Sequence, residues 1–279
     1  MKGVKLYKMS GAGNDFVVLD GRGVDVSGFR QPEHIRELCR EFRTDGLMIL
    51  LEGDEDFRME FYNPDGSGGM MCGNGGRCIV AFADWLGIAP ADGRIYHFLA
   101  PDGLHCAEIL SKTEKGWMVK LEMIDVEGIS EVLGGYFLNT GTRHFVKFVE
   151  DVDAVDVATE GKELRWNEAF APEGTNVNFV QRMPDGTLKI RTFEKGVEGE
   201  TLACGTGITA AALATWFAYG DGERAGLCPE KRGPVPAFPV AHETIRLQAR
   251  RGDILTVDFI PDGSAKFHDI HLTGPAEFV

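Results

Sequence analysis

Two stretches of this chain are apolar on every side, unlike the rest of the sequence. Between Gly205 and Gly220 there is no charged residue, and between Arg77 and Gly87 there is only Asp84. A helix without a polar face is buried on all sides, and a glycine after its last apolar residue is typical of a helix C-terminus. The pattern therefore predicts two central helices, each wrapped by the strands of its own domain.

Most of the remaining sequence is typical of short strands on either side of Gly, Asp-Gly or Pro-Asp-Gly turns. Such stretches occur at 9–20, 43–67, 179–196 and 253–274. The segment 31–42 has helical spacing instead, with one apolar face formed by Ile35, Leu38, Cys39 and Phe42. A further helix is expected near 156–170. The chain is therefore predicted to be rich in strands, with few helices.

The two apolar helices follow similar loops, "MMCGNGGRC" at 70–78 and "TLACGTGIT" at 201–209. Other similar positions recur at nearly the same separation. The pairs Cys72/Cys204 and Phe61/Phe193 are each 132 residues apart, and Phe16/Phe145 are 129 residues apart. A constant separation in constant order indicates an internal repeat, and chance similarity of glycine loops is the alternative.

The repeat predicts two similar domains related by a pseudo-twofold axis. The chain of 279 residues is long enough for both to bury a sizeable core. We place the N-terminal domain at 1–118, completed by a C-terminal strand at 266–279, and the C-terminal domain at 119–265.

The composition of the chain disfavours several classes of partner and site. The chain has 29 basic and 43 acidic residues, a net charge of −14, which disfavours nucleic acid and anionic membranes as partners. The N-terminus lacks an apolar signal segment, and no apolar run reaches the roughly 18 residues of a membrane span. The six cysteines form no Cys-x-x-Cys pair, so zinc ribbons and thioredoxin-type sites are not expected. We expect a cytoplasmic protein with reduced thiols and no metal.

Cys72 and Cys204 are each expected at a helix N-terminus, where unpaired N–H groups and the helix dipole favour negative charge. A free cysteine titrates near pH 8.5, and moving that value to about 7 requires about 2 kcal/mol, near the upper end of what a helix terminus supplies. Amides freed by Gly73, Gly75 and Gly205 are suited to a substrate carboxylate.

If the pseudo-twofold axis passes through a cleft, the two sulfurs face one another across a ligand site. A thiolate then removes an α-proton from one side of a carbon, and the opposite thiol delivers a proton to the other side. One sulfur is ionised while the other is protonated, so the two titrations are coupled. This pairing predicts inversion at the α-carbon of an amino acid.

The other cysteines are interpreted as buried and inert, namely Cys39, Cys106 and Cys228. Cys78 is interpreted as a core residue, with a disulfide to Cys72 under oxidation as the alternative. The sequence "GAGND" enters a strand rather than a helix, which excludes a dinucleotide-binding loop. No Gly-Lys-Ser/Thr follows either Cys72 or Cys204, which excludes a P-loop.

Several motifs spread over essentially the whole chain resemble the diaminopimelate epimerase family: "MSGAGNDFVVLD", "NPDGSGGMMCGNGGRC", "GTNVNFV", "FEKGVEGETLACGTG" and "LTGPAEFV". The resemblance implies an α+β fold of two pseudo-symmetric domains, each a β-barrel-like sheet wrapped around a central apolar helix. It implies interconversion of LL- and meso-2,6-diaminopimelate without pyridoxal phosphate or metal, for lysine and peptidoglycan precursors. It also implies a cytoplasmic homodimer that acts on a small amino acid and needs no cofactor.

The resemblance also implies site residues. Cys72 and Cys204 match the catalytic bases, and His144 and Glu194 match residues that tune the cysteine pKa values. The substrate-binding positions match Asn14, Asn63, Gly73, Asn74, Asn176, Glu194, Lys195, Gly205 and Thr206. Without the resemblance, Asn14 and Asn176 are as well explained as turn caps, Thr206 as an N-cap, and Glu194 as a solvated turn residue.

Two departures from the family affect recognition of the distal end of the substrate. Lys195 stands where the family usually has arginine, and lysine lacks the bidentate fork for a carboxylate. Thr142 and Arg143 replace the family's Asn-Pro before His144. We hypothesise that Arg143 or Lys195 takes over part of the distal carboxylate binding. The segment 221–244 is interpreted as a surface loop.

Three other functions compete with this one. A proline or hydroxyproline racemase uses a similar cysteine pair, but that group has His where this chain has Asn74, and Ser-Pro where it has Leu202-Ala203. A non-catalytic amino-acid- or anion-binding protein that had lost the chemistry would not need to keep both cysteines. A Cys-His hydrolase using His144 would need one nucleophile and no duplicate.

Overall fold

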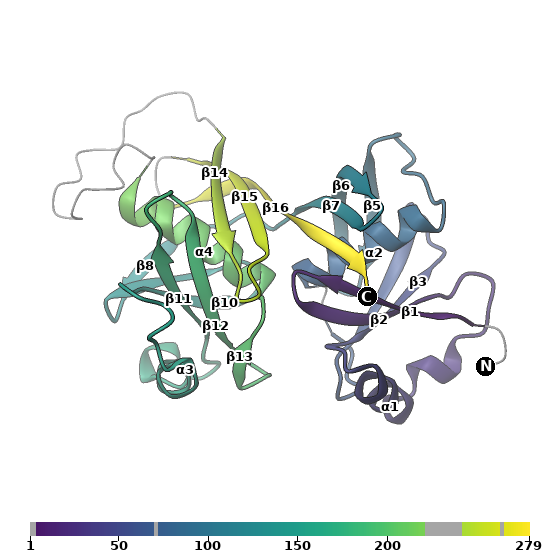
Figure 1. The fold of residues 1–279 in the computed structure, drawn as a ribbon, viewed down its shortest axis with the longest axis horizontal. Coiled ribbons are helices and arrows are strands. Elements are labelled where there is room, and N and C mark those ends of the chain that lie inside the picture. The colour runs from purple at the N-terminus through teal and green to yellow at the C-terminus, as the bar shows by residue number, and fades with distance from the viewer. Residues whose placement is uncertain (1–3, 70–71, 221–241, 263–264) are drawn as a thin grey trace. The chain divides into compact units, whose positions relative to one another are not determined.

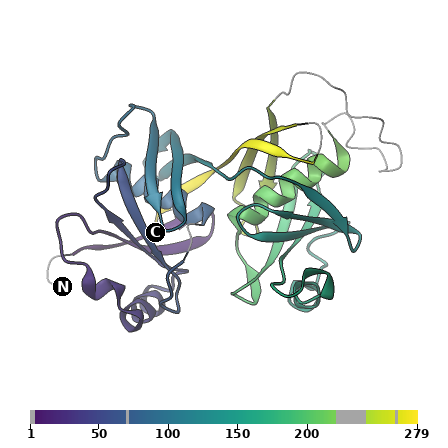
Figure 2. The same cartoon turned by 180° about the vertical axis from the view of Figure 1, so that it is seen from behind.

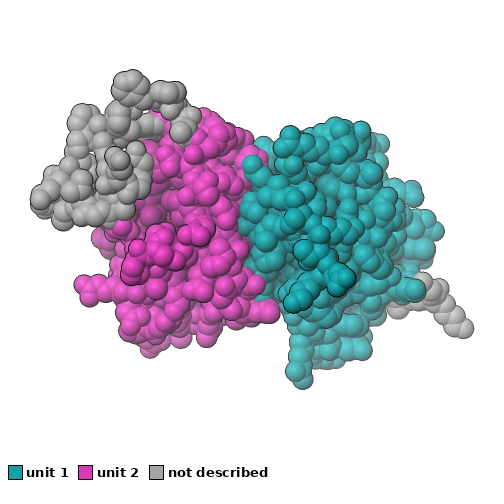
Figure 3. Space-filling model, turned by 45° about the horizontal axis from the view of Figure 1, so that its top comes forward, with its two compact units in different colours: residues 1–122, 273–279 teal, residues 123–272 magenta. Residues whose placement is uncertain are grey.

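The computed structural model describes residues 4–69, 72–220, 242–262 and 265–279. The chain divides into two compact units (Figure 3), unit 1 with Met1–Glu122 and Thr273–Val279, and unit 2 with Met123–Leu272. The boundaries placed from the sequence, 118/119 and 265/266, fall inside strand β7 (Gly116–Glu122) and just before strand β16 (Phe267–Phe278). The two compact units divide at 122/123 and 272/273, so β7 lies wholly in unit 1 and β16 contributes to both units.

Unit 1 is a closed ring of eight strands in the order β1-β2-β3-β4-β5-β6-β7-β16, and β16 pairs with β1 through Met9 and Phe278. The remaining strands are β1 (Leu6–Gly11), β2 (Asn14–Asp20), β3 (Leu47–Leu51), β4 (Phe57–Tyr62), β5 (Ile95–Ala100) and β6 (Gly103–Thr113). Closure leaves this sheet without a free edge.

One helix lies inside this ring and one outside it. Helix α2 (Gly73–Trp85) is buried from Gly73 to Ala83 and contacts β1, β2, β3, β6 and β7 (Figure 1). Helix α1 (Pro32–Phe42), preceded by the 3₁₀ turn η1 (Ser27–Arg30), joins the parallel strands β2 and β3 and packs its apolar face on them. Both helices confirm the sequence prediction.

Unit 2 follows the path β16-β15-β14-β12-β11-β10-β9-β8. The segment just before β8 returns to β16, where Val126 pairs with Phe267. The strands are β8 (Ile129–Val132), β9 (Gly135–Asn139), β10 (Arg143–Phe148), β11 (Asn176–Arg182), β12 (Leu188–Glu194), β14 (Glu243–Gln248) and β15 (Ile254–Pro261). The short β13 (Gly199–Thr201) pairs with β12 on the edge opposite β11.

The helices of unit 2 repeat the arrangement of unit 1 (Figures 1 and 2). Helix α4 (Gly205–Tyr219) contacts β9, β10, β11, β12, β14 and β15, and its first three turns are almost entirely buried. Helix α3 (Val157–Arg165) packs on β11, β12 and β13 from the other face. With the 3₁₀ turn η2 (Glu168–Phe170), it accounts for the helix expected near 156–170.

Strand pairing confirms the internal repeat. In unit 1, β1–β2 is antiparallel, β2–β3 parallel, β3–β4 antiparallel and β4–β5 parallel. In unit 2 the same order holds for β9–β10, β10–β11, β11–β12 and β12–β14. Each unit is thus a strand layer around a central helix, as predicted. Among the described residues, no helix is long and apolar enough to cross a membrane.

Candidate active site

Cys72 is the N-cap of α2 in unit 1. Its backbone is extended, with φ −101° and ψ 150°, and its carbonyl accepts the N–H of Gly76 at 2.8 Å. Its Sγ accepts the N–H of Gly75 at 3.2 Å. A Cβ on Gly75 would lie 3.3 Å from that sulfur and 3.3 Å from Met48 Sδ, so glycine leaves room for this contact. The sulfur therefore occupies the position of an N-capping oxygen, at the positive end of the helix dipole.

A chain of polar side chains surrounds this helix end. The fully buried Arg77 donates to Gly73 O at 3.1 Å and to Asn74 Oδ1 at 2.9 Å. Asn74 Nδ2 donates to Asn14 Oδ1, and Asn14 Nδ2 donates to Asp45 Oδ2 at 3.1 Å. The structure thus brings Asn14, Gly73 and Asn74 together at the first turn of α2.

Asn63 lies in the turn that follows β4. Its Nδ2 donates to Ser67 Oγ at 3.1 Å, and its backbone N–H donates to Ser67 O at 2.9 Å. This turn precedes the glycine loop that leads to Cys72. The contact of Asn63 with substrate remains a prediction.

Cys204 is the N-cap of α4 in unit 2 and is 8% exposed. Its backbone is also extended, with φ −123° and ψ 109°, and its carbonyl accepts the N–H of Ile208 at 2.8 Å. Its Sγ lies 3.4 Å from the hydroxyl of Thr206. The two cysteines therefore occupy equivalent places in the two units, as the repeat predicts.

His144 lies on β10 beneath the N-terminus of α4 and is fully buried. Its Nε2 is 2.9 Å from Thr142 Oγ1 and 2.9 Å from Thr206 Oγ1, and its Nδ1 is 3.1 Å from Asn178 Nδ2. Burial lowers the pKa of His144 to about 3, against a smaller opposing effect of the Asn178 hydrogen bond. The imidazole is therefore neutral near pH 7 and is joined to Cys204 through Thr206.

Asn176 joins the ends of three strands in unit 2. Its Nδ2 donates to Arg143 O at 3.0 Å and to Thr142 Oγ1 at 3.3 Å, and its Oδ1 accepts the N–H of Lys195 at 2.7 Å. The side chain is 4% exposed. It positions the turn that carries Glu194, which is half-buried, and Lys195, which is exposed.

The structure separates the two cations proposed for the distal carboxylate. Arg143 forms an ion pair with Glu173, and its guanidinium lies 5.1 Å above the ring of Phe137. Because successive side chains of a strand point to opposite faces, Arg143 points away from the face of β10 that carries His144. Lys195 has no ion-pair partner among the residues that the structure describes, so it is the better candidate of the two.

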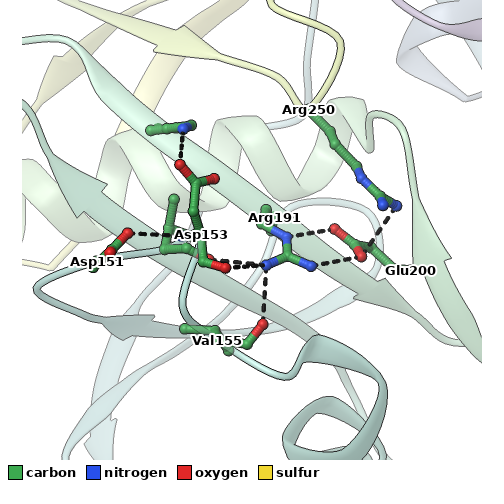
Figure 4. A network of polar contacts seen from close by, with 8 residues as sticks. Asp151, Asp153, Val155, Arg191, Glu200 and Arg250 are labelled. Atoms are coloured by element: carbon green, nitrogen blue, oxygen red, sulfur yellow. Dashed lines mark hydrogen bonds and ion pairs between the residues drawn. The ribbon is translucent and has the colours of Figure 1, made fainter.

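A network of ion pairs fixes the hairpin that leads to Cys204 (Figure 4). Arg191 on β12 holds Glu200 on β13 with two bonds of 2.7 and 2.9 Å, and Arg250 reaches the same carboxylate at 3.0 Å. Arg191 also donates to Val155 O at 2.9 Å in the segment that enters α3. These ion pairs hold Glu200 of β13, four residues before Cys204, against strand β12.

The remaining cysteines differ in environment. Cys39 and Cys78 are buried free thiols, and burial raises the pKa of both. Cys106 on β6 is only half-buried, so its assignment to the core was wrong. Its Sγ lies 3.2 Å from His97 Nδ1, and burial together with Glu122 raises its pKa to about 11. Cys228 and most of the segment 221–244 lie outside the described residues.

The sequence did not single out Asn178, Thr192 or Arg77. Asn178 stands two residues after Asn176 in "GTNVNFV", so strand alternation places both side chains on the same face of β11. Arg77 is one of only two charged residues in α2, the other being Asp84 near its end, and a charge in the buried first turns indicates a group with dedicated acceptors. Both signals were present in the sequence.

Comparison with known proteins gives a consistent assignment. The family model described as "Diaminopimelate epimerase" matches residues 6–121 and 136–232. Proteins named diaminopimelate epimerase from Aquifex aeolicus and Flavobacterium psychrophilum are 38% and 40% identical to this chain. The alignments cover 97% of this chain and 94% of the first protein, and 99% of this chain and 98% of the second.

Solved structures share the fold at low sequence identity. A PhzF-family phenazine biosynthesis protein from Bacillus anthracis has a TM-score of 0.73 and 12% identity, with 100% of this chain and 98% of that chain covered. A probable proline racemase from Agrobacterium radiobacter with bound carbonate has a TM-score of 0.63 and 16% identity, with 99% and 91% covered. At these identities the similarity shows the fold alone.

Proposed function

The chain belongs to the diaminopimelate epimerase family and is an isomerase, and on that premise we propose that it interconverts LL- and meso-2,6-diaminopimelate by proton transfer between Cys72 and Cys204. The observation that carries the proposal is the pair of cysteines at equivalent N-caps of two buried helices. A hydrolase or a binding protein has no use for this duplication.

In the proposed reaction, a thiolate removes the α-proton of one stereocentre. The electron pair left on the α-carbon is delocalised onto the substrate carboxylate, and the opposite thiol delivers its proton to the other face. The first sulfur ends as a thiol and the second as a thiolate, so the reverse reaction starts from the mirror arrangement. Two groups are needed because a single base returns the proton to the face from which it came.

Helix dipoles and loop amides stabilise the charge that develops. The amides at Gly73 and Asn74 and at Gly205 and Thr206 lie in the first turns of α2 and α4, where the helix leaves N–H groups without intrahelical partners. Donors placed where charge develops contribute more in a water-excluded site than in bulk water. The carboxylate of the reacting centre is therefore assigned to these turns.

The other end of the substrate is assigned to Glu194 and Lys195. Asn176 fixes the position of the Lys195 amide, and the exposed Lys195 ammonium supplies charge for a distal carboxylate. Asn14 and Asn63 complete the set of proposed polar contacts. The proposal includes no cofactor, a homodimer, a cytoplasmic location, and a role in lysine and peptidoglycan precursor synthesis.

A racemase or epimerase acting on proline or hydroxyproline is the second candidate, because solved structures named a probable proline racemase and a hydroxyproline epimerase share the fold. One has a TM-score of 0.63 and the other of 0.62, each at 16% identity. Asn74 argues against it, since its amide is held between Arg77 and Asn14 at the position where that group has histidine.

The substrate assay separates these functions. The reduced protein is incubated with LL-diaminopimelate, L-proline or trans-4-hydroxy-L-proline, and stereoisomers are resolved by chiral chromatography. We expect meso-diaminopimelate to form and both proline substrates to remain unchanged. Turnover of a proline substrate alone would support the racemase, and calorimetric binding of diaminopimelate without turnover would support a binding protein.

A further inference from the structure

Arg165, the last residue of α3, is a buried cation that the proposed reaction does not use. Its side chain is 4% exposed. The ring of the exposed Trp166 covers the guanidinium, with 4.0 Å between Arg165 Cζ and the ring centroid. A charged group is stable in a protein interior only where dedicated acceptors replace its lost hydration. The hydrogen bonds of Arg165 therefore identify the segments that this residue joins.

Arg165 joins helix α3 to two turns of unit 2. Its Nη1 donates to Glu173 O at 3.2 Å, in the turn before β11. Its Nε and Nη2 donate to Glu198 Oε1 at 3.3 and 3.2 Å, in the β12–β13 hairpin. A guanidinium can only donate, so the direction of these bonds is fixed. A Cβ on Gly174, whose φ is +66°, would lie 1.6 Å from Arg165 Nη1, so the turn before β11 encloses the guanidinium closely.

Glu198 closes the turn of this hairpin. Its Oε1, which accepts from Arg165, also accepts the N–H of Gly196 at 3.1 Å, and its own N–H donates to Glu194 O at 2.9 Å. Its φ is 53°, a left-handed conformation that is costly for a residue other than glycine and persists only where surrounding contacts hold it. One oxygen of Glu198 thus connects the buried guanidinium to the backbone of the turn.

The same turn carries Glu194 and Lys195, the residues assigned to the distal end of the substrate. Asn176 Oδ1 accepts the N–H of Lys195 at 2.7 Å, and Asn176 Nδ2 donates to Thr142 Oγ1 at 3.3 Å. Thr142 Oγ1 lies 3.2 Å from Thr206 Oγ1, in the first turn of α4. Within unit 2, two side chains therefore connect this hairpin to the helix end that carries the candidate base.

We infer that Arg165 and Glu198 are positioning residues that hold the 194–199 hairpin in the conformation that binds the distal end of the substrate. Arg165 acts through Glu198, and Glu198 acts through the backbone of the turn. The Lys195 side chain is exposed and long, so a fixed backbone limits the region that its ammonium can reach. The inference rests on the proposed function in taking Glu194 and Lys195 as the distal site.

The first test uses no substrate. Hydrogen exchange is followed by mass spectrometry in the matched variants Glu198→Gln and Glu198→Met, on peptides from the hairpin and, as an internal control, from β11. Glutamine keeps an oxygen that can accept from Gly196 and Arg165, whereas methionine keeps only the length of the side chain. We expect exchange in the hairpin to be about tenfold faster in Glu198→Met than in the wild type. Exchange should be unchanged in Glu198→Gln, and in β11 of both variants.

The second test compares two ligands that differ only at the distal end. LL-diaminopimelate carries a distal ammonium and carboxylate, and L-2-aminoheptanoate carries neither. In Glu198→Met we expect KM for diaminopimelate to rise about tenfold with little change in kcat, and the inhibition constant of aminoheptanoate to stay within about twofold of the wild-type value. Glu198→Gln should retain the wild-type constants. Arg165→Gln should behave as Glu198→Met, and if it does not fold, the two Glu198 variants still decide the question.

An equal loss of affinity for both ligands in Glu198→Met would overturn the inference, because a residue that only stabilises unit 2 does not distinguish one end of the substrate from the other. So would exchange that accelerates equally in the hairpin and in β11, or wild-type exchange and kinetics in Glu198→Met. A wild-type protein that does not turn over diaminopimelate would contradict the proposed function, and the exchange measurement would still decide whether Arg165 and Glu198 hold the hairpin.

Discussion

The first turns of α2 and α4 have the same backbone and different side-chain partners. In both, an extended cysteine caps the helix and its carbonyl accepts the N–H four residues later, at 2.8 Å. Cys72 Sγ accepts a backbone N–H from Gly75, whereas Cys204 Sγ contacts the hydroxyl of Thr206 and has no capping bond of that kind. The repeat has preserved the position of the sulfur and changed the groups that bind it.

The side chains one turn further into each helix also differ. Arg77 and Thr209 are equivalent positions, and each donates to the carbonyl of the glycine after the cysteine, at 3.1 Å in both cases. In unit 1, the first turn of the helix contacts the buried cation Arg77, which ends a hydrogen-bonded chain through Asn74 and Asn14 to Asp45. In unit 2, the corresponding turn contacts the hydroxyl of Thr209 and the neutral imidazole of His144. Unlike surroundings suit two thiols of which one must be ionised while the other is protonated.

The cysteines themselves should give the largest effect. Replacing Cys72 or Cys204 by Ser leaves a hydroxyl that is too weak an acid to act as base near pH 7. We expect each single variant to form meso-diaminopimelate about 10³-fold more slowly than the wild type. Near-normal turnover in either one would show that the duplicated cap is not used as a pair.

Arg77 and Thr209 test whether equivalent positions carry unequal energies. Arg77→Met removes a buried charge together with its hydrogen bonds to Gly73 O and Asn74 Oδ1, and we expect unfolding to require about 3 kcal/mol less free energy. Thr209→Val, the matched control in unit 2, removes one neutral hydrogen bond and should cost about 1 kcal/mol. Urea denaturation measures both, and equal losses would contradict the comparison.

His144 should make unit 2 sensitive to acid. The folded pKa is about 3 and the ordinary value is 6.5, so below pH 6.5 the unfolded chain binds a proton that the folded chain does not. This contribution to stability is complete above pH 6.5 and is lost as the pH falls toward 3, by about 1.4 kcal/mol per pH unit. Urea unfolding between pH 4 and 7 should show a shallower dependence for His144→Gln than for the wild type, and parallel curves would refute the assignment.

Lys195 and Arg143 test recognition at the distal end. Lys195→Met should raise KM about tenfold, equivalent to about 1.4 kcal/mol of binding. Arg143→Met should leave KM unchanged, because its guanidinium is paired with Glu173 on the other face of β10. Steady-state kinetics on both variants gives the answer, and the opposite ranking would assign the distal carboxylate to Arg143.

The sequence predicted the parts of the fold that depend on continuous patterns. Helix α4 has no charged residue and α2 has only Arg77 and Asp84, a composition that predicts burial on all sides. The 132-residue separation of Cys72 and Cys204 predicted equivalent caps. The face of β10 on which Arg143 lies also follows from the sequence, because the side chains of Arg143 and His144, successive residues of one strand, point to opposite faces. The family resemblance identifies Arg143 as a cation near the site but does not indicate this face.

Other features depend on tertiary contacts that no local pattern contains. Strand β16 contributes residues to both units, and no local pattern in the sequence marks the division at 272/273 within it. Cys106 was interpreted as buried because cysteines usually are, but its strand leaves the side chain half-buried beside His97. The contacts of the buried Asn178 with Phe145 and Thr192 likewise come from two other strands.

The most direct test of the account is the early distribution of deuterium. LL-diaminopimelate is incubated in D₂O, and both stereoisomers are analysed by mass spectrometry at less than about 10% conversion. If Cys72 and Cys204 act on opposite faces, newly formed meso-diaminopimelate carries one deuterium at the inverted carbon while the remaining LL isomer retains hydrogen. Deuterium entering the remaining LL isomer as fast as the product would indicate a single base and would contradict the two-cysteine mechanism.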